Sequence, residues 1–291
     1  MKFCLLPNRQ STDVSRNILR ETQRIEPIEK VTEMKLKLLW KNAFSCFTLL
    51  ALCSCASQFQ MPANRFESPE VRGKTGLAHF DVLGVQGGYA LGLSSLPAKS
   101  NTQSDINATL DSAPLSLFSG ATIGILKRAE AGFRFQTLGP LALHGKFQFI
   151  GNPESEANDG NFSVAAVATI GFTLNSSSNP SGSSFQNANT SFLNYDGGLV
   201  TGYRFNPSSL IYLGATYSSA SYSGSLTDSK TNVTLSEYSG SATQLSFHLG
   251  YQYDIADLYF KVELARASAT IPKLKDSLTG FFPGILLGLR F

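Results

Sequence analysis

The last twelve residues constrain the fold more than any other stretch of this sequence. They read GFFPGILLGLRF. Counting back from the terminal Phe291, alternate positions carry large apolar side chains, at Leu289, Leu287 and Ile285. The positions between them are polar or small, with Leu286 as the exception. A period of two is that of a β-strand with two different faces, so the chain is expected to end in such a strand.

Similar alternation recurs from residue 77 onward, in segments separated by turn-forming residues. The clearest hairpin lies between residues 244 and 264, where apolar and polar side chains alternate on both arms. We expect about ten antiparallel strands, within a range of eight to twelve, at 77–94, 115–126, 130–138, 141–151, 162–174, 197–205, 210–221, 244–253, 258–264 and 280–291.

The connections between these strands are of two kinds. Tight turns are expected at 127–128, 206–208 and 254–257, and long loops rich in Ser, Asn and Thr at about 95–114, 175–195, 222–240 and 271–279. Transmembrane barrels have short periplasmic turns and longer extracellular loops. This rule puts residue 76 and Phe291 on the same, periplasmic side.

The alternation fits a transmembrane barrel better than a soluble β-barrel or sandwich, in which the same two faces would be reversed. Only 15% of the residues are charged, whereas a soluble surface needs roughly a quarter to a third. No segment after residue 55 is long and apolar enough for a membrane helix, so strands that cross lipid have to close on themselves. We therefore predict an all-β, antiparallel transmembrane β-barrel over 77–291.

The N-terminal part reads as targeting material. Lysines and then an apolar run, within MKLKLLWKNAFSCFTLLAL, indicate a signal peptide over 34–54. A signal peptide normally begins at the initiating Met, so residues 1–33 are expected to be a non-native extension ahead of a true start at Met34. Nine of the 24 basic and five of the 21 acidic residues precede Cys55. The remaining 15 and 16 leave no basic surface for nucleic acid.

Cys55 resembles the acylated cysteine of bacterial lipoproteins, because Leu52 stands at −3 and Ser54 at −1 as in a lipobox. The alternative is ordinary cleavage after Ala56, which also has small residues at −3 and −1. Residues 55–76, with Pro62 and Pro69, then read as a periplasmic tether. All four cysteines lie at or before Cys55, so no disulfide or thiolate metal site is expected in the barrel.

A strand that ends the chain on an aromatic residue, behind a secretion signal, resembles the C-terminal strand of bacterial outer-membrane β-barrels. In that family the terminal aromatic, here Phe291, helps the barrel-assembly machinery to recognise the chain. The resemblance implies an outer membrane of the Gram-negative type, with outer-membrane lipid and the assembly machinery as partners and both termini in the periplasm.

Several polar residues fall on the face that would line the lumen. The lining is expected to include Arg134, His144, Lys146, Arg204, His248, Lys261, Glu263 and Arg290. Two interpretations stay open: a mostly cationic pore that favours anions, or the hydrogen-bonded filling of a narrow barrel. The many glycines on this face, such as Gly84 and Gly288, would leave volume for a narrow pore.

The functional prediction is a small channel or passive pore for small solutes. The first alternative is a plugged structural or surface-interaction barrel that acts through its Ser/Asn-rich loops, and the second is a lipid-modifying enzyme that would use His248, His144 or His79. No G-x-S-x-G, H-E-x-x-H, phosphate-loop or calcium-loop motif is present. We therefore expect no enzymatic activity and no cofactor or metal.

Overall fold

A computed structural model describes residues 58–95, 106–137, 139–178, 186–228, 231–272 and 276–291. The predicted N-terminal extension, the signal peptide and Cys55 lie outside the described residues. No helix of the described part is long and apolar enough to cross a membrane.

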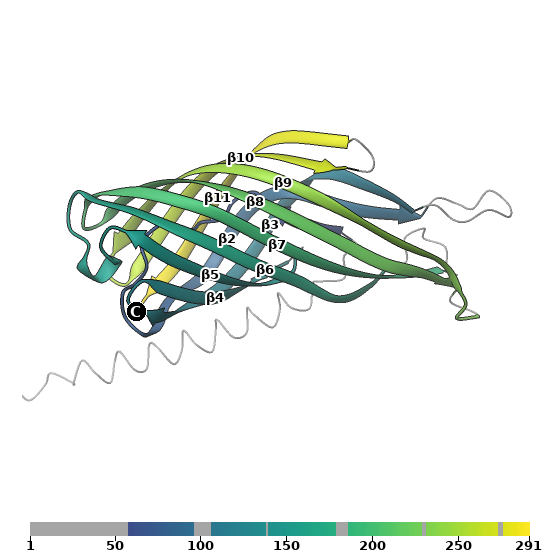
Figure 1. Ribbon diagram of the computed structural model, residues 1–291, viewed down its shortest axis with the longest axis horizontal. Helices are drawn as coiled ribbons and strands as arrows, with labels where there is room; N and C mark the ends of the chain where they lie inside the picture. The colour runs from purple at the N-terminus through teal and green to yellow at the C-terminus, as the bar shows by residue number, and fades with distance from the viewer. Residues whose placement is uncertain (1–57, 96–105, 138, 179–185, 229–230, 273–275) are drawn as a thin grey trace, which may run out of the picture. The chain divides into compact units, whose positions relative to one another are not determined.

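The described residues form a closed antiparallel barrel of ten wall strands (Figure 1). These are β2 (Gly76–Ser95), β3 (Ile106–Leu126), β4 (Ala129–Gln136), β5 (Leu141–Ile150), β6 (Asn161–Ser178), β7 (Gln186–Asn206), β8 (Ser209–Asp228), β9 (Thr234–Ile255), β10 (Leu258–Ile271) and β11 (Asp276–Arg290). Each strand pairs with the next in sequence, and β2 pairs with both β3 and β11, which closes the ring. The predicted fold class and strand number are confirmed.

The two faces of the wall differ as the alternation predicts. Along β10 the side chains are exposed and buried in strict turn from Leu258 to Ala269. The exposed side chains on β9, β10 and β11 include Leu249, Val262 and Ile285, which are 37–54% exposed. A closed barrel that turns large apolar side chains outward is the architecture of bacterial outer-membrane barrels, and it supports a location in such a membrane.

The predicted long loops are largely wrong. β3 already begins at Ile106, β7 at Gln186 and β9 at Thr234, and β8 continues to Asp228. These Ser-, Asn- and Thr-rich stretches pair in register, as between Ser223 and Ser239. Their sequence hides the strand because the outward positions carry hydroxyl side chains, as at Ser221 and Ser223, in place of the large apolar ones that identified the other strands.

The barrel has two distinct ends. At one end lie the turns 127–128, 207–208 and 256–257, the short 3-10 helix η2 (Glu154–Glu156) and the terminal Phe291. We call this the short-turn end and the opposite one the far end. At the far end β6 to β9 extend well beyond the hairpin of β4 and β5, so the wall is uneven in height.

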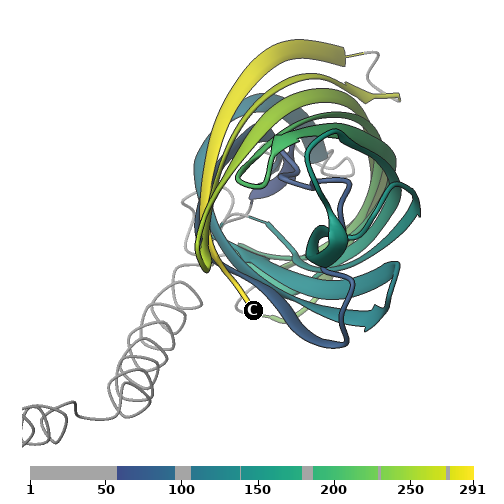
Figure 2. The ribbon, with the colours of Figure 1, turned by 90° about the vertical axis from the view of Figure 1, so that its left-hand side faces the viewer.

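The segment before β2 does not form a periplasmic tether. Its described part begins with β1 (Gln58–Pro62), which pairs with β2 from Gly92 to Gly88, and then continues through the lumen to the short-turn end (Figure 2). From Phe59 to Val71 all residues except Glu67 are buried. We call residues 58–75 the inner segment. The tether prediction failed because a polar, Pro-containing stretch looks the same whether water or a polar lumen surrounds it.

Candidate functional site: the occupied lumen

The barrel wall binds the backbone of the inner segment at its centre. The Glu263 carboxylate accepts hydrogen bonds from the backbone N–H of Arg65, at 2.6 Å, and of Phe66, at 2.8 Å. Lys261 Nζ donates to the Phe66 carbonyl at 2.8 Å. Both wall residues belong to the inner face of β10 and are buried. They therefore satisfy backbone groups that would otherwise be buried without partners.

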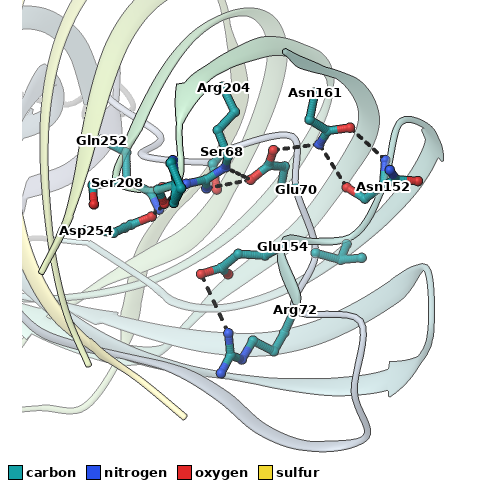
Figure 3. A network of polar contacts seen from close by, with 12 residues as sticks. Ser68, Glu70, Arg72, Asn152, Glu154, Asn161, Arg204, Ser208, Gln252 and Asp254 are labelled. Atoms are coloured by element: carbon teal, nitrogen blue, oxygen red, sulfur yellow. Dashed lines mark hydrogen bonds and ion pairs between the residues drawn. The ribbon is translucent and has the colours of Figure 1, made fainter. Parts of the chain in front are cut away.

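The carboxylate of Glu70 is held by side chains of β6 and β7 (Figure 3). Arg204 on β7 donates to Glu70 Oε2 from Nε at 2.9 Å and from Nη2 at 2.6 Å. Asn161 donates to the other carboxylate oxygen at 2.8 Å. Arg204 also pairs with Asp254 at 3.1 Å, and the side chains of Arg204, Glu70 and Asp254 are at most 2% exposed. Such a charge-assisted fork fixes the position of the segment as well as its charge.

Two more wall cations contact the segment. Lys146 Nζ donates to the carbonyls of Ser68, at 3.3 Å, and Glu70, at 2.9 Å, and pairs with Glu130 at 3.0 Å. Arg134 donates to the Arg65 carbonyl at 3.0 Å. Arg134 also pairs with Glu67 at 3.4 Å. Arg134, Lys146, Arg204 and Lys261 thus all bind the inner segment.

At the short-turn end, η2 lies against the inner segment and the wall. Its Glu154 backbone N–H donates to the Val71 carbonyl at 2.8 Å, and its carboxylate pairs with His79 at 3.0 Å and Arg290 at 2.7 Å. Burial raises the pKa of Glu154, but the hydrogen bond and charge of His79 and the charge of Arg290 outweigh it, so the net pKa lies well below the usual range. Figure 2 shows η2 across this mouth of the barrel.

Glycines on the inner face make room for the inner segment and for wall side chains. A Cβ on Gly88 would lie 2.2 Å from the Met61 carbonyl oxygen, and one on Gly124 would lie 1.8 Å from that of Lys74. A Cβ on Gly284 would meet the Phe66 ring, and one on Gly288 the Tyr259 ring. At these four positions the space beside the glycine is therefore taken by the inner segment or by a wall side chain.

The far half of the lumen is apolar where the short-turn half is charged. Phe59 of β1 stacks on Phe192 of β7 with ring centroids 4.7 Å apart. Met61 and Tyr89 belong to the same buried cluster as the inward-facing alanines of β10. Gln244 of β9 donates to the Pro62 carbonyl at 2.8 Å, which ties the end of β1 to β9.

A cavity of about 30 Å³ lies between the inner segment and the wall strands β4 to β9. That is room for about two water molecules. Arg65, His144 and His248 are among the residues that line it. Neither ring nitrogen of His248 has a hydrogen-bond partner among the described residues, so ordered water is the natural partner there.

Every predicted lumen residue lies on the inner side of the wall or at its short-turn rim: Arg134, His144, Lys146, Arg204, His248, Lys261, Glu263 and Arg290. What sequence reasoning missed is their partners in the inner segment, above all Glu67 and Glu70. A signal was present, since a mostly cationic lining in a narrow barrel needs anions that the wall strands supply only in part.

Two of the three histidines contact polar side chains of the wall or of η2. His144 contacts the Thr122 hydroxyl at 3.3 Å, and His79 contacts Glu154. No group of three or more His, Cys, Asp or Glu side chains is placed to hold a metal ion among the residues that the structure describes.

Phe291, the predicted assembly signal, joins the end of the chain to β2 by donating its N–H to the Ala78 carbonyl at 3.0 Å.

Three solved structures resemble parts of this chain. Ail, the attachment invasion locus protein of Yersinia pestis, is 16% identical, covers 74% of this chain and 99% of its own, and has a TM-score of 0.27. The outer membrane protease OmpT of Escherichia coli is 11% identical, with 75% and 94% covered and a TM-score of 0.29. The copper transporter OprC is 11% identical, with 75% and 43% covered and a TM-score of 0.31.

No protein-family model matches the sequence, and no curated protein matches it. At the identities and TM-scores above, the three structures carry no argument about function. The functional argument therefore rests on the lumen itself.

Proposed function

We propose that this protein is an outer-membrane barrel that its own inner segment keeps closed, and that it serves as a structural or surface-interaction protein. The observation that carries this proposal is the occupied lumen. The inner segment makes buried ion pairs and backbone hydrogen bonds with β4, β5, β7, β9 and β10 along its whole course.

The passive-pore alternative loses its main support in this geometry. Its argument was a cationic lining, and Arg134, Lys146, Arg204 and Lys261 all bind groups of the inner segment instead. A permeating anion would have to replace Glu70 at Arg204, where both side chains are at most 2% exposed. Separating such a buried pair costs about 3–5 kcal/mol, so thermal motion alone opens this path rarely.

The far end supplies the surface for an interaction role. Beyond the apolar belt, the outward positions of β8 and β9 carry hydroxyl side chains, at Ser219, Ser221, Ser241 and Thr243. With the short-turn end in the periplasm, as in other barrels of this type, this wall stands above the membrane. It presents rigid paired strands to the outside.

Planar-bilayer recording tests the proposal directly. The full-length barrel is expected to give no steady current. A variant in which a Gly/Ser linker of equal length replaces residues 58–72 is expected to give discrete, anion-selective conductance, because the cations of the lining are then free.

Two single substitutions form a matched pair of test and control. Glu70→Gln removes a buried partner of Arg204 and is expected to cause brief openings. Glu156→Gln removes the partner of Lys127 in an exposed ion pair, in which the side chains of Glu156 and Lys127 are 49% and 61% exposed. This variant is expected to give no current, because exposed pairs contribute little. Steady conductance of the unmodified protein would overturn the proposal in favour of the pore.

A further inference from the structure

The direction of the inner segment determines on which side of the membrane it begins. β1 is antiparallel to β2, with Gln58 opposite Gly92 and Pro62 opposite Gly88. β2 itself starts at Gly76, at the short-turn end, where His79 pairs with Arg290. Gln58 therefore lies towards the far end, at the other end of the barrel from Phe291.

The contacts of the inner segment run in one order from the far end to the short-turn end. Pro62 meets Gln244, and the Ala63 N–H donates to the Gly87 carbonyl at 2.9 Å. At the other end the Arg72 guanidinium donates to the Phe291 carbonyl oxygen. The segment thus crosses the barrel once, as an eleventh passage inside ten wall strands.

This passage is as long as a membrane is thick. Gly92 lies sixteen positions after Gly76 on β2. This spacing is about 53 Å along a strand, and about 40 Å along the axis of a barrel whose strands are tilted by about 40°. The apolar band of such barrels is about 25 Å tall. On the adjacent β3, Leu115 is an outward apolar residue, 62% exposed, and Gly92 pairs six residues beyond it, with Thr109.

The seam between β2 and β11 fixes the segment in this direction. The two strands pair only from His79 to Val85. Beyond Val85, towards the far end, the Asn64 side chain joins β2 to β11 instead. Its Oδ1 accepts a hydrogen bond from the Gly87 N–H at 3.0 Å, and its Nδ2 donates to the Phe282 carbonyl at 2.9 Å. β1 then takes the edge of β2 that β11 leaves.

We propose that the mature N-terminus of this protein lies at the outer surface of the membrane, on the opposite side from Phe291, so that an acyl group on Cys55 anchors the chain in the outer leaflet. Cys55 is three residues from Gln58, and three residues reach at most about 11 Å. The inner leaflet at the short-turn end is about 40 Å away by the strand count above. Cleavage after Ala56 would leave a free amine on the same outer side.

The inference replaces the expectation that both termini are periplasmic. It takes from the proposed function only the assignment of the short-turn end to the periplasm. Whether the lumen conducts is a separate question, because a closed or an open barrel can hold its N-terminus at the far end. The experiment below therefore tests topology without relying on conductance.

Single thiols in intact cells test the proposal, read with a maleimide that does not cross the outer membrane. Ser57→Cys in the Cys55→Ser background reports the N-terminus, Val233→Cys the far end and Ser208→Cys the short-turn end. Val233 is 56% exposed in the turn between β8 and β9, and Ser208 lies in the turn between β7 and β8. Heat-modifiable electrophoretic mobility of each variant shows that its barrel has folded.

The expected result is that the thiol at 57 reacts in intact cells together with the one at 233, while the one at 208 reacts only after the outer membrane is permeabilised. A thiol at 57 that reacts together with the one at 208 overturns the proposal. If the thiol at 57 stays unreactive until unfolding, an epitope inserted between Ser57 and Gln58 decides: antibody binding to intact cells supports the proposal, and binding only after permeabilisation overturns it. Reaction at 208 with none at 233 would reverse the barrel's orientation and overturn the outer-surface assignment.

Discussion

At the residue scale, the inner segment is held in the barrel by charges that are paired inside it. Glu70 and Arg204 form an ion pair that is almost completely buried, and Glu263 accepts hydrogen bonds from two backbone N–H groups of the inner segment. In a buried site, each such group is costly without its partner. Wall and segment therefore depend on each other, and removing either leaves buried charges unpaired.

Glu154 gives a prediction about pH at this scale. Because the folded protein lowers the pKa of Glu154, its ionised form stabilises the fold fully above its ordinary pKa of 4.5, and this stabilisation is lost as the pH falls through the lower folded value. Glu154→Gln should destabilise the barrel at pH 7 by about 1.5–3 kcal/mol, the size of hydrogen bonds to a charged group. Denaturant titrations in detergent at pH 7 and at stepwise lower pH measure the difference between variant and parent.

That difference should stay constant from pH 7 down to about 4.5 and shrink in stronger acid. A difference that grows on acidification would contradict the role assigned to Glu154.

At the scale of elements, β2 is the strand on which the architecture depends. It pairs with β3 along one edge and with β11 and then β1 along the other. Register shifts occur along it, one of them between Gln86 and Gly88. Bulges re-aim a strand locally, and this one lies where β2 exchanges β11 for the inner segment.

Gly88→Ala tests whether β1 needs this close approach. The new Cβ would lie 2.2 Å from the Met61 carbonyl oxygen, which is backbone and cannot rotate away. We expect β1 to detach and the protein to lose about 1–3 kcal/mol of stability, as in other overpacked sites. Hydrogen exchange of residues 58–62, together with a denaturant titration, measures both effects.

Gly197→Ala on β7 is the matched control, since nothing lies within 4 Å of its added Cβ. It should leave exchange at β1 unchanged and should not lower stability, because Ala is about 0.5–1 kcal/mol better than Gly inside a strand. Equal exchange in the two variants would show that β1 does not depend on Gly88.

At the scale of the whole molecule, the barrel is an apolar belt with a polar extension. On β9 the outward side chains from Leu245 to Ile255 are large and apolar or aromatic, and those from Thr243 to Glu237 are hydroxylic or charged. Transmembrane strands need only about 9–11 residues, whereas β7 to β9 have 20–22. About half of each strand is therefore available outside the membrane.

Charge substitutions along one face of β9 locate the belt. Leu249→Arg places a cation among outward apolar residues, where it should cost about 2–4 kcal/mol. Ser241→Arg lies on the same face, eight residues nearer the far end, and should cost about 0–1 kcal/mol. Unfolding titrations in lipid vesicles compare the two, and equal costs would show that the belt does not end between these positions.

The sequence alone determined the class of fold. Alternation identified the wall strands because each face has its own solvent, lipid outside and a polar interior inside, and this difference is written at every second residue. The same rule identified the inward polar side chains, such as Lys146 and Glu263. It failed at the far end, where the outward positions of β8 carry serines such as Ser219 and Ser221, so that the large apolar residues of a lipid-facing strand are missing there.

Only the tertiary structure decided what fills the barrel. Residues 58–75 have no period of their own because Glu67 and Glu70 face different strands, Arg134 on β4 and Arg204 on β7, and their partners are set by the closed ring. A glycine in the sequence is equally compatible with empty space and with close contact, and here Gly88 and Gly284 adjoin the inner segment. Closure of the barrel brings these distant groups together, so whether the lumen is open or occupied follows from contacts between residues more than a hundred positions apart.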